Sequence, residues 1–409
     1  MHIKQKAIFP SIDIEALNLV VDNATAVIQQ ARRSMLAPNS RKTPPTFNSS
    51  RLAELCGLEM TQVLYLAKKG ELPSGEKEGS SRREWTLAEA RQWVRTIKAE
   101  TLRDPKLSAA TTIAVANFKG GVSKTTTAAA VAQGLSLLGH KVLVIDTDPQ
   151  GSLTTLFGVL PDTEVEAHHT ILSLCSGESE SIMEAVQPTY WDGIDLVAAA
   201  PVLFNAEFLL PARQKTESNF AFWQVFDSGL EEARDIYDVI IIDTPPSLSY
   251  ITINALIAAD GVVMPLPPNA LDFASSIQFW SLFTEVCESL FKARGDTKKF
   301  SFLDIVLARV DKADAVSLDV REWIIQAYGS KVLQVEIPKT SIAATASAEF
   351  GTVYDLDSSS AQAKTLKRAR DAYDELVKHL ALQISGVWEA DIEIGMSQPV
   401  KFAASKGIV

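Results

Sequence analysis

The chain alternates short apolar runs with helical stretches, a pattern typical of an α/β protein. Residues 111–116, 141–145 and 235–242 predict buried strands, because each contains a short apolar run bounded by polar residues. An Ala-rich helix is predicted from Thr126 to Leu138, and Gly139 ends it. Strands that alternate with helices in this way predict a doubly wound, mostly parallel sheet.

Two amphipathic helices are predicted at the ends of the chain. Residues 12–36 need a partner for their apolar stripe, either a second copy of the chain or its own neighbouring domain. Residues 360–385 should pack their stripe on the sheet domain, and residues 386–409, which show no period, are expected to form a mobile tail. The first stripe consists of Leu17, Val20, Val21, Ala24, Ile28, Ala31 and Met35, and the second of Leu366, Tyr373, Leu376, Val377, Leu380 and Ile384.

A small module is predicted between residues 47 and 98. One helix should begin at Ser49 or Ser50 and end at Gly57, and a second should run from Thr61 to Gly70, which is helix-turn-helix spacing. A polar loop over residues 73–81 and a strand at 82–85 follow. Thr86 and Glu89 then form a capping box that opens a helix to about Lys98.

This order of elements resembles the winged-helix DNA-binding modules of the MerR type. The basic residues expected to contact DNA are Lys68, Lys69, Arg82 and Arg83. A small helical adaptor with a solvated basic surface is the alternative.

Charge is distributed unevenly along the 409 residues. The net charge is −11, yet residues 1–110 hold 17 Lys and Arg against 12 Asp and Glu, while the remainder holds 22 against 38. A basic front end favours a nucleic-acid-binding module attached to an acidic body. The three cysteines form no CxxC pair, and no apolar run approaches the roughly 20 residues of a membrane helix. We therefore expect a cytoplasmic protein that has no zinc site and does not bind a membrane.

The most specific signal is the segment Asn-Phe-Lys-Gly-Gly-Val-Ser-Lys-Thr-Thr at residues 117–126, which lies between a predicted strand and a predicted helix. Gly120 and Gly121 leave room for main-chain N–H groups to surround phosphate oxygens. Lys124 would neutralise the outer phosphates, and Thr125 would offer its hydroxyl to Mg²⁺. The positive end of the following helix would face the same charge.

Acidic residues follow two other predicted strands. Asp146 and Asp148 come after the strand at 141–145, and Asp243 comes after the strand at 235–242. Ligands of open α/β sheets lie outside the carboxyl ends of the strands. The phosphate loop and both acidic segments should therefore meet in one crevice.

Lys119-Gly120-Gly121-Val122-Ser123-Lys124-Thr125, Asp146-Thr147-Asp148-Pro149-Gln150 and Asp243-Thr244-Pro245-Pro246 resemble the deviant Walker A, A′ and B motifs of the ParA plasmid-partition ATPases. The resemblance covers about residues 108–385. It implies an ATPase that uses ATP, ADP and Mg²⁺. Lys119 would reach across a sandwich dimer to the partner's ATP, and Asp148 would polarise the attacking water.

The resemblance also implies a set of site residues. The catalytic residues would be Lys119, Lys124 and Asp148, and the metal-binding residues Thr125, Asp146 and Asp243. Nucleotide would be bound by Lys119, Gly120, Gly121, Val122, Ser123, Lys124, Thr125, Thr126, Pro268 and Asn269. DNA would be bound at the start of the C-terminal helix by Lys364, Lys367, Arg368 and Arg370, although solvated helix charges would explain the same cluster.

The function that the resemblance implies is DNA partitioning in the nucleoid by a homodimer. A ParB-like centromere-binding partner would stimulate hydrolysis, and the winged helix would repress the chain's own operon at an operator. A transcriptional regulator that uses ATP only as a ligand and a MinD-like positioning ATPase remain alternatives. The expected domains are a dimerisation helix and linker (1–44), a winged helix-turn-helix domain (45–106), a P-loop ATPase domain (107–385) and a flexible tail (386–409).

Overall fold

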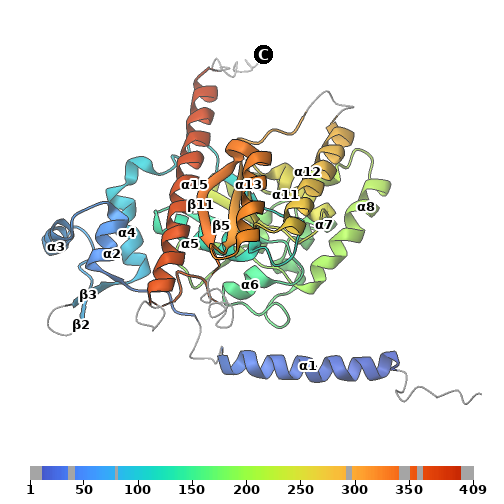
Figure 1. Cartoon of the computed structure of the whole chain (residues 1–409), viewed down its shortest axis with the longest axis horizontal. Helices are drawn as coiled ribbons and strands as arrows, with labels where there is room; N and C mark the ends of the chain where they lie inside the picture. Colours follow the sequence, from blue (N-terminus) through green and yellow to red (C-terminus); the bar gives the residue numbers. More distant parts are fainter. Residues whose placement is uncertain are drawn as a thin grey trace, which may run out of the picture. The chain divides into compact units, whose positions relative to one another are not determined.

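The computed structural model describes residues 12–35, 42–78, 82–291, 297–339, 351–356 and 363–397 (Figure 1). The chain divides into two compact units, residues 1–43 and residues 44–409. In the first unit, helix α1 (Ile14–Met35) begins where the Asp13 carboxylate accepts a hydrogen bond from the Ala16 N–H at 2.8 Å. This confirms the helix predicted at residues 12–36.

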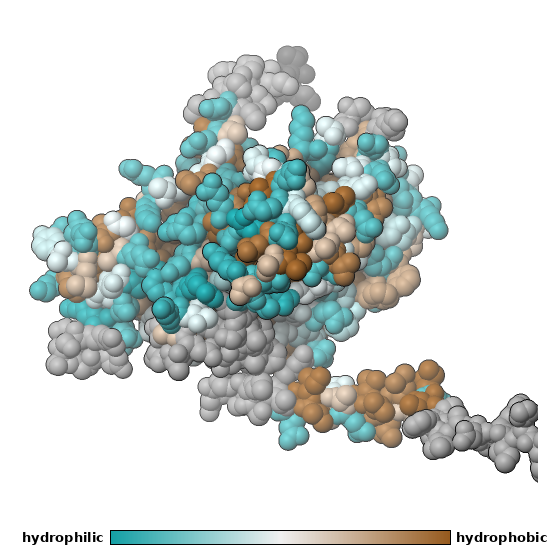
Figure 2. Space-filling model, in the orientation of Figure 1, coloured by the Kyte–Doolittle hydropathy of each residue, from teal (hydrophilic) through white to brown (hydrophobic). Residues whose placement is uncertain are grey.

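The described part of the α1 apolar stripe is exposed to solvent. Figure 2 shows apolar side chains gathered along this helix. The exposed members are Leu17, Val20, Val21, Ala24 and Ile28. The side chains of Ala31 and Met35 lie outside the described part of the chain, and the partner of the stripe stays a prediction.

An eight-stranded sheet organises the second unit. Its order is β11-β10-β9-β4-β8-β5-β7-β6, and all neighbours are parallel except β7 and β6. The strands are β4 (Thr111–Val115), β5 (Val142–Asp146), β6 (Gln187–Pro188), β7 (Ile194–Val197), β8 (Val239–Asp243), β9 (Gly261–Leu266), β10 (Phe302–Val310) and β11 (Val332–Pro338). The doubly wound, mostly parallel sheet is confirmed. However, β8 begins at Val239 rather than at Asp235, because the preceding residues form a helix.

Helices cover both faces of this sheet, so its central strands are buried along their whole length. Helices α5 and α15 share an apolar cluster with one face, and α7 to α11 share another with the opposite face. The helices of this layered part are α5 (Lys124–Leu137), α6 (Ser152–Leu156), α7 (Leu172–Ser176), α8 (Ala206–Thr216), α9 (Val225–Gly229), α10 (Glu231–Ile236), α11 (Tyr250–Ala258), α12 (Ala270–Phe291), α13 (Ala315–Tyr328) and α15 (Ala363–Ser397).

Helix α15 corrects the prediction for the C-terminus. The helix does not end at residue 385 but continues to Ser397, so residues 386–397 are not a tail. Trp388 lies one turn beyond Ile384 on the same face, is buried, and packs edge-on against His140 with ring centroids 5.6 Å apart. Burial of this indole extends the docked stripe by a turn. Residues 398–409 lie outside the described residues.

The module predicted at residues 47–98 consists of β1 (Phe47–Asn48), α2 (Ser49–Cys56), α3 (Met60–Lys69), β2 (Glu76–Glu78), β3 (Arg82–Trp85) and α4 (Leu87–Ile97). Its strands form an antiparallel sheet in the order β1-β3-β2. Trp85 and Trp93 meet edge to face, and both indoles donate a 2.9 Å hydrogen bond to the Pro73 carbonyl. This small core fixes the hairpin β2–β3 on α4.

The chemistry of the helix ends in this module partly follows the prediction. Gly57 and Gly70 end α2 and α3 in the left-handed conformation, and the capping box of Thr86 and Glu89 is present. The N-cap of α2 is Asn48 rather than Ser49 or Ser50, because the Asn48 side chain accepts the Arg51 N–H. The loop predicted at residues 73–81 also contains a strand, β2.

Two arginines of α4 connect this module to α5. The buried Arg91 guanidinium donates to the Ser136 and His140 carbonyls at 2.9 Å, and it also pairs with Asp192. Arg95 donates to the Gly139 carbonyl. Carbonyl groups at a helix C-terminus lack partners within the helix, and cations satisfy both their hydrogen bonds and the negative end of the dipole.

Among the helices that the structure describes, none is long and apolar enough to cross a membrane.

His140 gives the second unit a testable pH dependence. Burial, reinforced by Arg95 and Arg91, lowers the pKa of His140 from 6.5 to about 4, although Asp238 opposes this effect. Between these values the unfolded chain binds a proton that the folded chain excludes, so the free energy of unfolding should fall as the pH drops below 6.5. We expect this residue to contribute a loss of about 2 kcal/mol between pH 7 and pH 5. Urea denaturation of wild type and His140→Gln across this range measures it. An equal slope in both proteins would contradict the assignment.

Candidate nucleotide site

The loop between β4 and α5 has the backbone that close approach to a phosphate requires. Gly121 and Ser123 both adopt the left-handed conformation, with φ of 73° and 74°. A Cβ at Gly121 would meet nothing within 4 Å, and one at Gly120 only Pro246, so this side of the loop is open. Ser123 adopts a conformation that is costly for a residue with a Cβ. Thr126 lies in the first turn of α5, which begins at Lys124 rather than at Thr126.

Lys124 is buried at the first position of α5. Its side chain curls back over the loop, and Nζ donates a 2.9 Å hydrogen bond to the Lys119 carbonyl. Burial lowers the pKa of Lys124, while the charges of Asp243 and Asp148 act in the opposite direction. The ammonium group is therefore held inside the loop, at the positive end of α5.

Asp243 ends β8 beside β4, where its backbone pairs in register with Val115. The side chain is fully buried, and neither carboxylate oxygen has a hydrogen-bond partner of standard geometry among the described residues. Burial, and next the neighbouring Asp146, raise the pKa of Asp243 far above its ordinary value, while Thr125 and Lys124 lower it. A buried carboxylate without a partner is costly. The oxygens of Asp243 and Thr125 are the kind of ligand that Mg²⁺ prefers, so these residues fit a magnesium ion.

Asp146 differs from Asp243 because its carboxylate already has protein partners. One oxygen accepts from the Thr154 N–H and hydroxyl at 2.8 Å, and the other accepts from the Asp148 N–H at 3.1 Å. Burial raises the pKa of Asp146 to about 7 against these hydrogen bonds. This side chain shapes the turn between β5 and α6. Its predicted role as a metal ligand stays a prediction.

Asp148 follows β5 at the same edge of the sheet. It is half-buried, and its carboxylate accepts the Gln150 N–H at 3.0 Å. The Thr147 hydroxyl donates a 2.6 Å hydrogen bond to the Asp243 carbonyl, which holds the ends of β5 and β8 together. The structure thus brings the loop and both acidic segments to one edge of the sheet, as the sequence predicts.

Lys119 differs from Lys124 in its surroundings. Its ammonium is 3.8 Å from the Asp272 carboxylate in the first turn of α12, and its side chain is 40% exposed. The Lys119 N–H donates to the Asn117 side chain, which in turn donates to the Pro265 carbonyl at 2.8 Å. The second lysine of the loop therefore has a solvent-accessible side chain on an anchored backbone.

Pro268 and Asn269 lie between β9 and α12. Pro268 is buried, whereas Asn269 is exposed, and its side chain accepts the Leu271 N–H at 2.9 Å. Asn269 thus helps to begin α12, and a contact of either residue with nucleotide stays a prediction.

Three residues of the site were not predicted from the sequence. Thr154 and Asn117 hold the two loops through side-chain hydrogen bonds. Arg309, at the end of β10, donates a 2.7 Å hydrogen bond to the Gly121 carbonyl. The sequence offered one sign of this contact, which is a lone arginine within the apolar run Ile305–Val310. Arg309 could not be linked to the loop, because it follows Gly121 by 188 residues in the sequence.

A parallel sheet, a phosphate loop with a buried lysine at the helix start and a buried aspartate on the adjacent strand define the class of P-loop ATPases. Comparisons with known proteins agree. Residues 110–293 match a family described as AAA domain. The chain is 30% identical over 265 residues to the chromosome partitioning protein ParA of Caulobacter vibrioides, a match that covers 63% of this chain and 92% of that protein.

Two further similarities extend this result. Protein SopA of Escherichia coli K12 is 28% identical over 364 residues, which is 84% of this chain and 89% of SopA. The structure of cobyrinic acid a,c-diamide synthase from Mycobacterium smegmatis, with a bound ATP analog and magnesium, has a TM-score of 0.51 and 29% identity over 66% of this chain and 94% of that one. The chain belongs to the ParA family of partition ATPases.

Proposed function

We propose that the chain partitions DNA by an ATP-controlled cycle of dimerisation. ATP and Mg²⁺ bound between two protomers close a sandwich dimer that binds DNA without sequence preference. A ParB-like partner stimulates hydrolysis, which opens the dimer and releases the DNA. The observation that carries this proposal is the pair of loop lysines with different surroundings. Lys124 is buried against its own loop, whereas Lys119 is accessible and has a long ion pair with Asp272.

The site residues divide the chemistry among them. Lys124 neutralises the phosphates of its own protomer's nucleotide, and the Asp243 and Thr125 oxygens hold the metal. When bound, Mg²⁺ supplies positive charge to the outer phosphate oxygens. Asp148 polarises the attacking water. Lys119 reaches the partner's nucleotide, because a partly exposed ammonium can leave the Asp272 carboxylate at little cost. The synthase crystallised with an ATP analog and magnesium supports the choice of ligands.

The module at residues 47–97 would bind an operator and repress the chain's own operon. In support, α3 follows α2 after a short turn, and the exposed Lys68 and Lys69 lie in its last turn. The hairpin β2–β3 provides a wing. The Arg83 guanidinium donates a 2.6 Å hydrogen bond to the Ser74 carbonyl, so part of its donor capacity serves the wing itself. The Arg82 side chain lies outside the described part.

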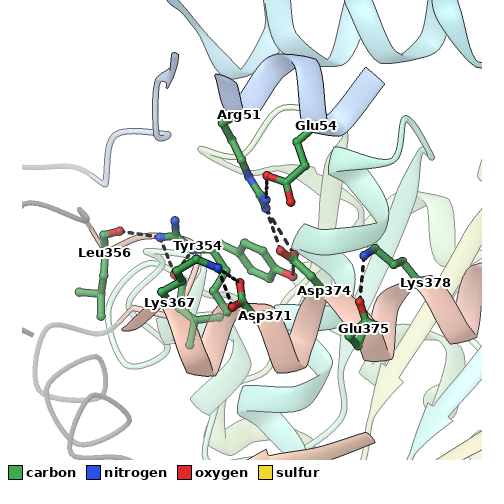
Figure 3. A network of polar contacts seen from close by, with 11 residues as sticks. Arg51, Glu54, Tyr354, Leu356, Lys367, Asp371, Asp374, Glu375 and Lys378 are labelled. Carbon is green, nitrogen blue, oxygen red and sulfur yellow. Dashed lines mark hydrogen bonds and ion pairs between the residues drawn. The ribbon is translucent and has the colours of Figure 1, made fainter. Parts of the chain in front are cut away.

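The start of α15 would contact DNA with fewer residues than predicted. Lys364 and Arg368 are exposed and have no ion pair to a described residue. Lys367 is exposed but pairs with Asp371 at 2.7 Å (Figure 3). The DNA contact predicted for Arg370 is corrected, because its half-buried guanidinium donates to the Val353 and Leu356 carbonyls. It stabilises the segment before α15 and is not offered to a ligand.

A transcriptional regulator that uses ATP only as a ligand is the remaining alternative from another class. It would need the module at residues 47–97 but no turnover, so Asp148 would be dispensable. The division of roles between Lys119 and Asp148 therefore separates the two functions.

Lys119→Ala should retain ADP binding but fail to hydrolyse ATP or to form the ATP dimer, because the variant lacks the charge that acts across the dimer. Asp148→Ala should bind ATP and remain in the closed dimer, since the water is no longer polarised. Light scattering of each protein with ATP and with ADP measures this. The ADP sample of the same protein accounts for any association through α1. Lys215→Ala, on the exposed face of α8, is the control. Identical behaviour of the Lys119 and Asp148 variants would refute the division of roles.

Replacing both Lys364 and Arg368 with Gln should weaken ATP-dependent binding to any duplex. The slope of log K against log salt should flatten by about 0.9 for each phosphate that the variant no longer neutralises. Lys367→Gln is the matched control on the same helix. Replacing Lys68 and Lys69 with Gln should instead weaken operator binding and leave ATP-dependent binding to scrambled duplex intact. Filter binding across a salt series measures both. Normal ATP-dependent binding by the Lys364 and Arg368 variant would remove α15 from the DNA surface.

A further inference from the structure

Strand β10 is irregular where it reaches the phosphate loop. Its pairing with β9 is regular from Phe302 to Leu307, but its pairing with β11 shifts register between Ile305 and Leu307 and again between Leu307 and Val310. Arg309 lies within the second shift and has a φ of 56°. A bulge of this kind re-aims a side chain, and such bulges are common beside active sites.

The backbone of Arg309 is strained for its residue type. Within the described residues, the residues other than glycine with positive φ are Ser123, Asn219 and Arg309. Asparagine tolerates this conformation, whereas arginine does not prefer it. Two of these three residues belong to the nucleotide site. Strain that is concentrated at one site points to a function for the side chain that requires it.

The side chain of Arg309 acts on the loop itself. Its guanidinium donates a 2.7 Å hydrogen bond to the carbonyl of Gly121, the other left-handed residue of the loop before Ser123. Anion binding by a loop requires its N–H groups to face the anion and its carbonyls to face away. A charged donor forms a stronger bond to that carbonyl than a neutral group does. Arg309 therefore holds one loop carbonyl in the direction that phosphate binding needs.

We propose that Arg309 is a positioning residue of the phosphate loop, which it keeps in the phosphate-binding conformation through the Gly121 carbonyl. This inference rests on the proposed nucleotide site. It assigns to β10, a strand that carries none of the predicted motifs, the task of preorganising a loop at the start of α5. The strained backbone of Arg309 is the structural cost of that task.

Arg309→Gly removes both the guanidinium and the backbone strain, because glycine adopts φ of 56° without penalty. The two losses act on different measurements. Its melting temperature without nucleotide should equal or exceed that of wild type, while its Kd for ATP with Mg²⁺ should rise by about tenfold, the lower end for one hydrogen bond from a charged group, because Arg309 is exposed. Arg309→Lys, which keeps a charged donor, should recover part of the affinity. Lys312→Gln is the matched control, since Lys312 is a nearby cation whose side chain is 82% exposed.

Calorimetric titration with ATP and thermal denaturation of the free proteins test the proposal together. Loss of affinity in Arg309→Gly at unchanged or raised stability, with partial rescue by Arg309→Lys, supports it. Wild-type affinity in Arg309→Gly, or equal losses in Arg309→Lys and Arg309→Gly, overturns it. If the wild-type chain itself bound no ATP, the nucleotide site would be refuted along with the role of Arg309, whereas the first two results concern Arg309 alone.

Discussion

Close packing around helix α5 is the constraint on which the rest of the structure depends. Nearly every residue of α5 is buried, and small residues such as Ala129 and Gly134 let the sheet and α15 approach it. A Cβ at Gly134 would lie 2.4 Å from the Val377 side chain. The first residue of the helix is Lys124, and the carbonyls at and beyond its last turn are held by Arg91. One rigid helix thus connects the phosphate loop with the module at residues 47–97.

Electrostatic and conformational costs gather at one end of this helix. Asp243 is buried without a hydrogen-bond partner of standard geometry among the described residues, and Ser123 and Arg309 adopt left-handed backbone. Each feature lowers the stability of the free protein. A divalent cation offsets the electrostatic part of this cost when it binds, because it supplies positive charge beside Asp243. The left-handed backbone instead keeps the loop in the conformation that binds phosphate.

The sequence predicted the loop and the acidic strand ends because their signals are local. Gly120 and Lys124 lie a few residues after the apolar run at 111–116, and Asp243 directly follows the run at 235–242, so their place at the carboxyl edge of the sheet follows from strand order alone. What it could not predict depends on contacts between distant residues. Packing decides that Thr154 donates to Asp146 and that Arg370 is half-buried. It also decides that Arg309 donates to the Gly121 carbonyl. The continuation of α15 was missed because Ser385 and Gly386 interrupt the apolar pattern directly after Ile384.

The central claim is that the loop between β4 and α5, together with the carboxylates at the ends of β5 and β8, binds ATP with Mg²⁺. Hydrogen–deuterium exchange of the full chain, with and without the nucleotide and metal, tests it most directly, since exchange reports the protection of individual backbone segments. The account predicts that protection on binding is strongest in residues 117–127 and also includes residues 146–151 and 243–247. Unchanged exchange in residues 117–127, with protection elsewhere in the chain, would contradict it.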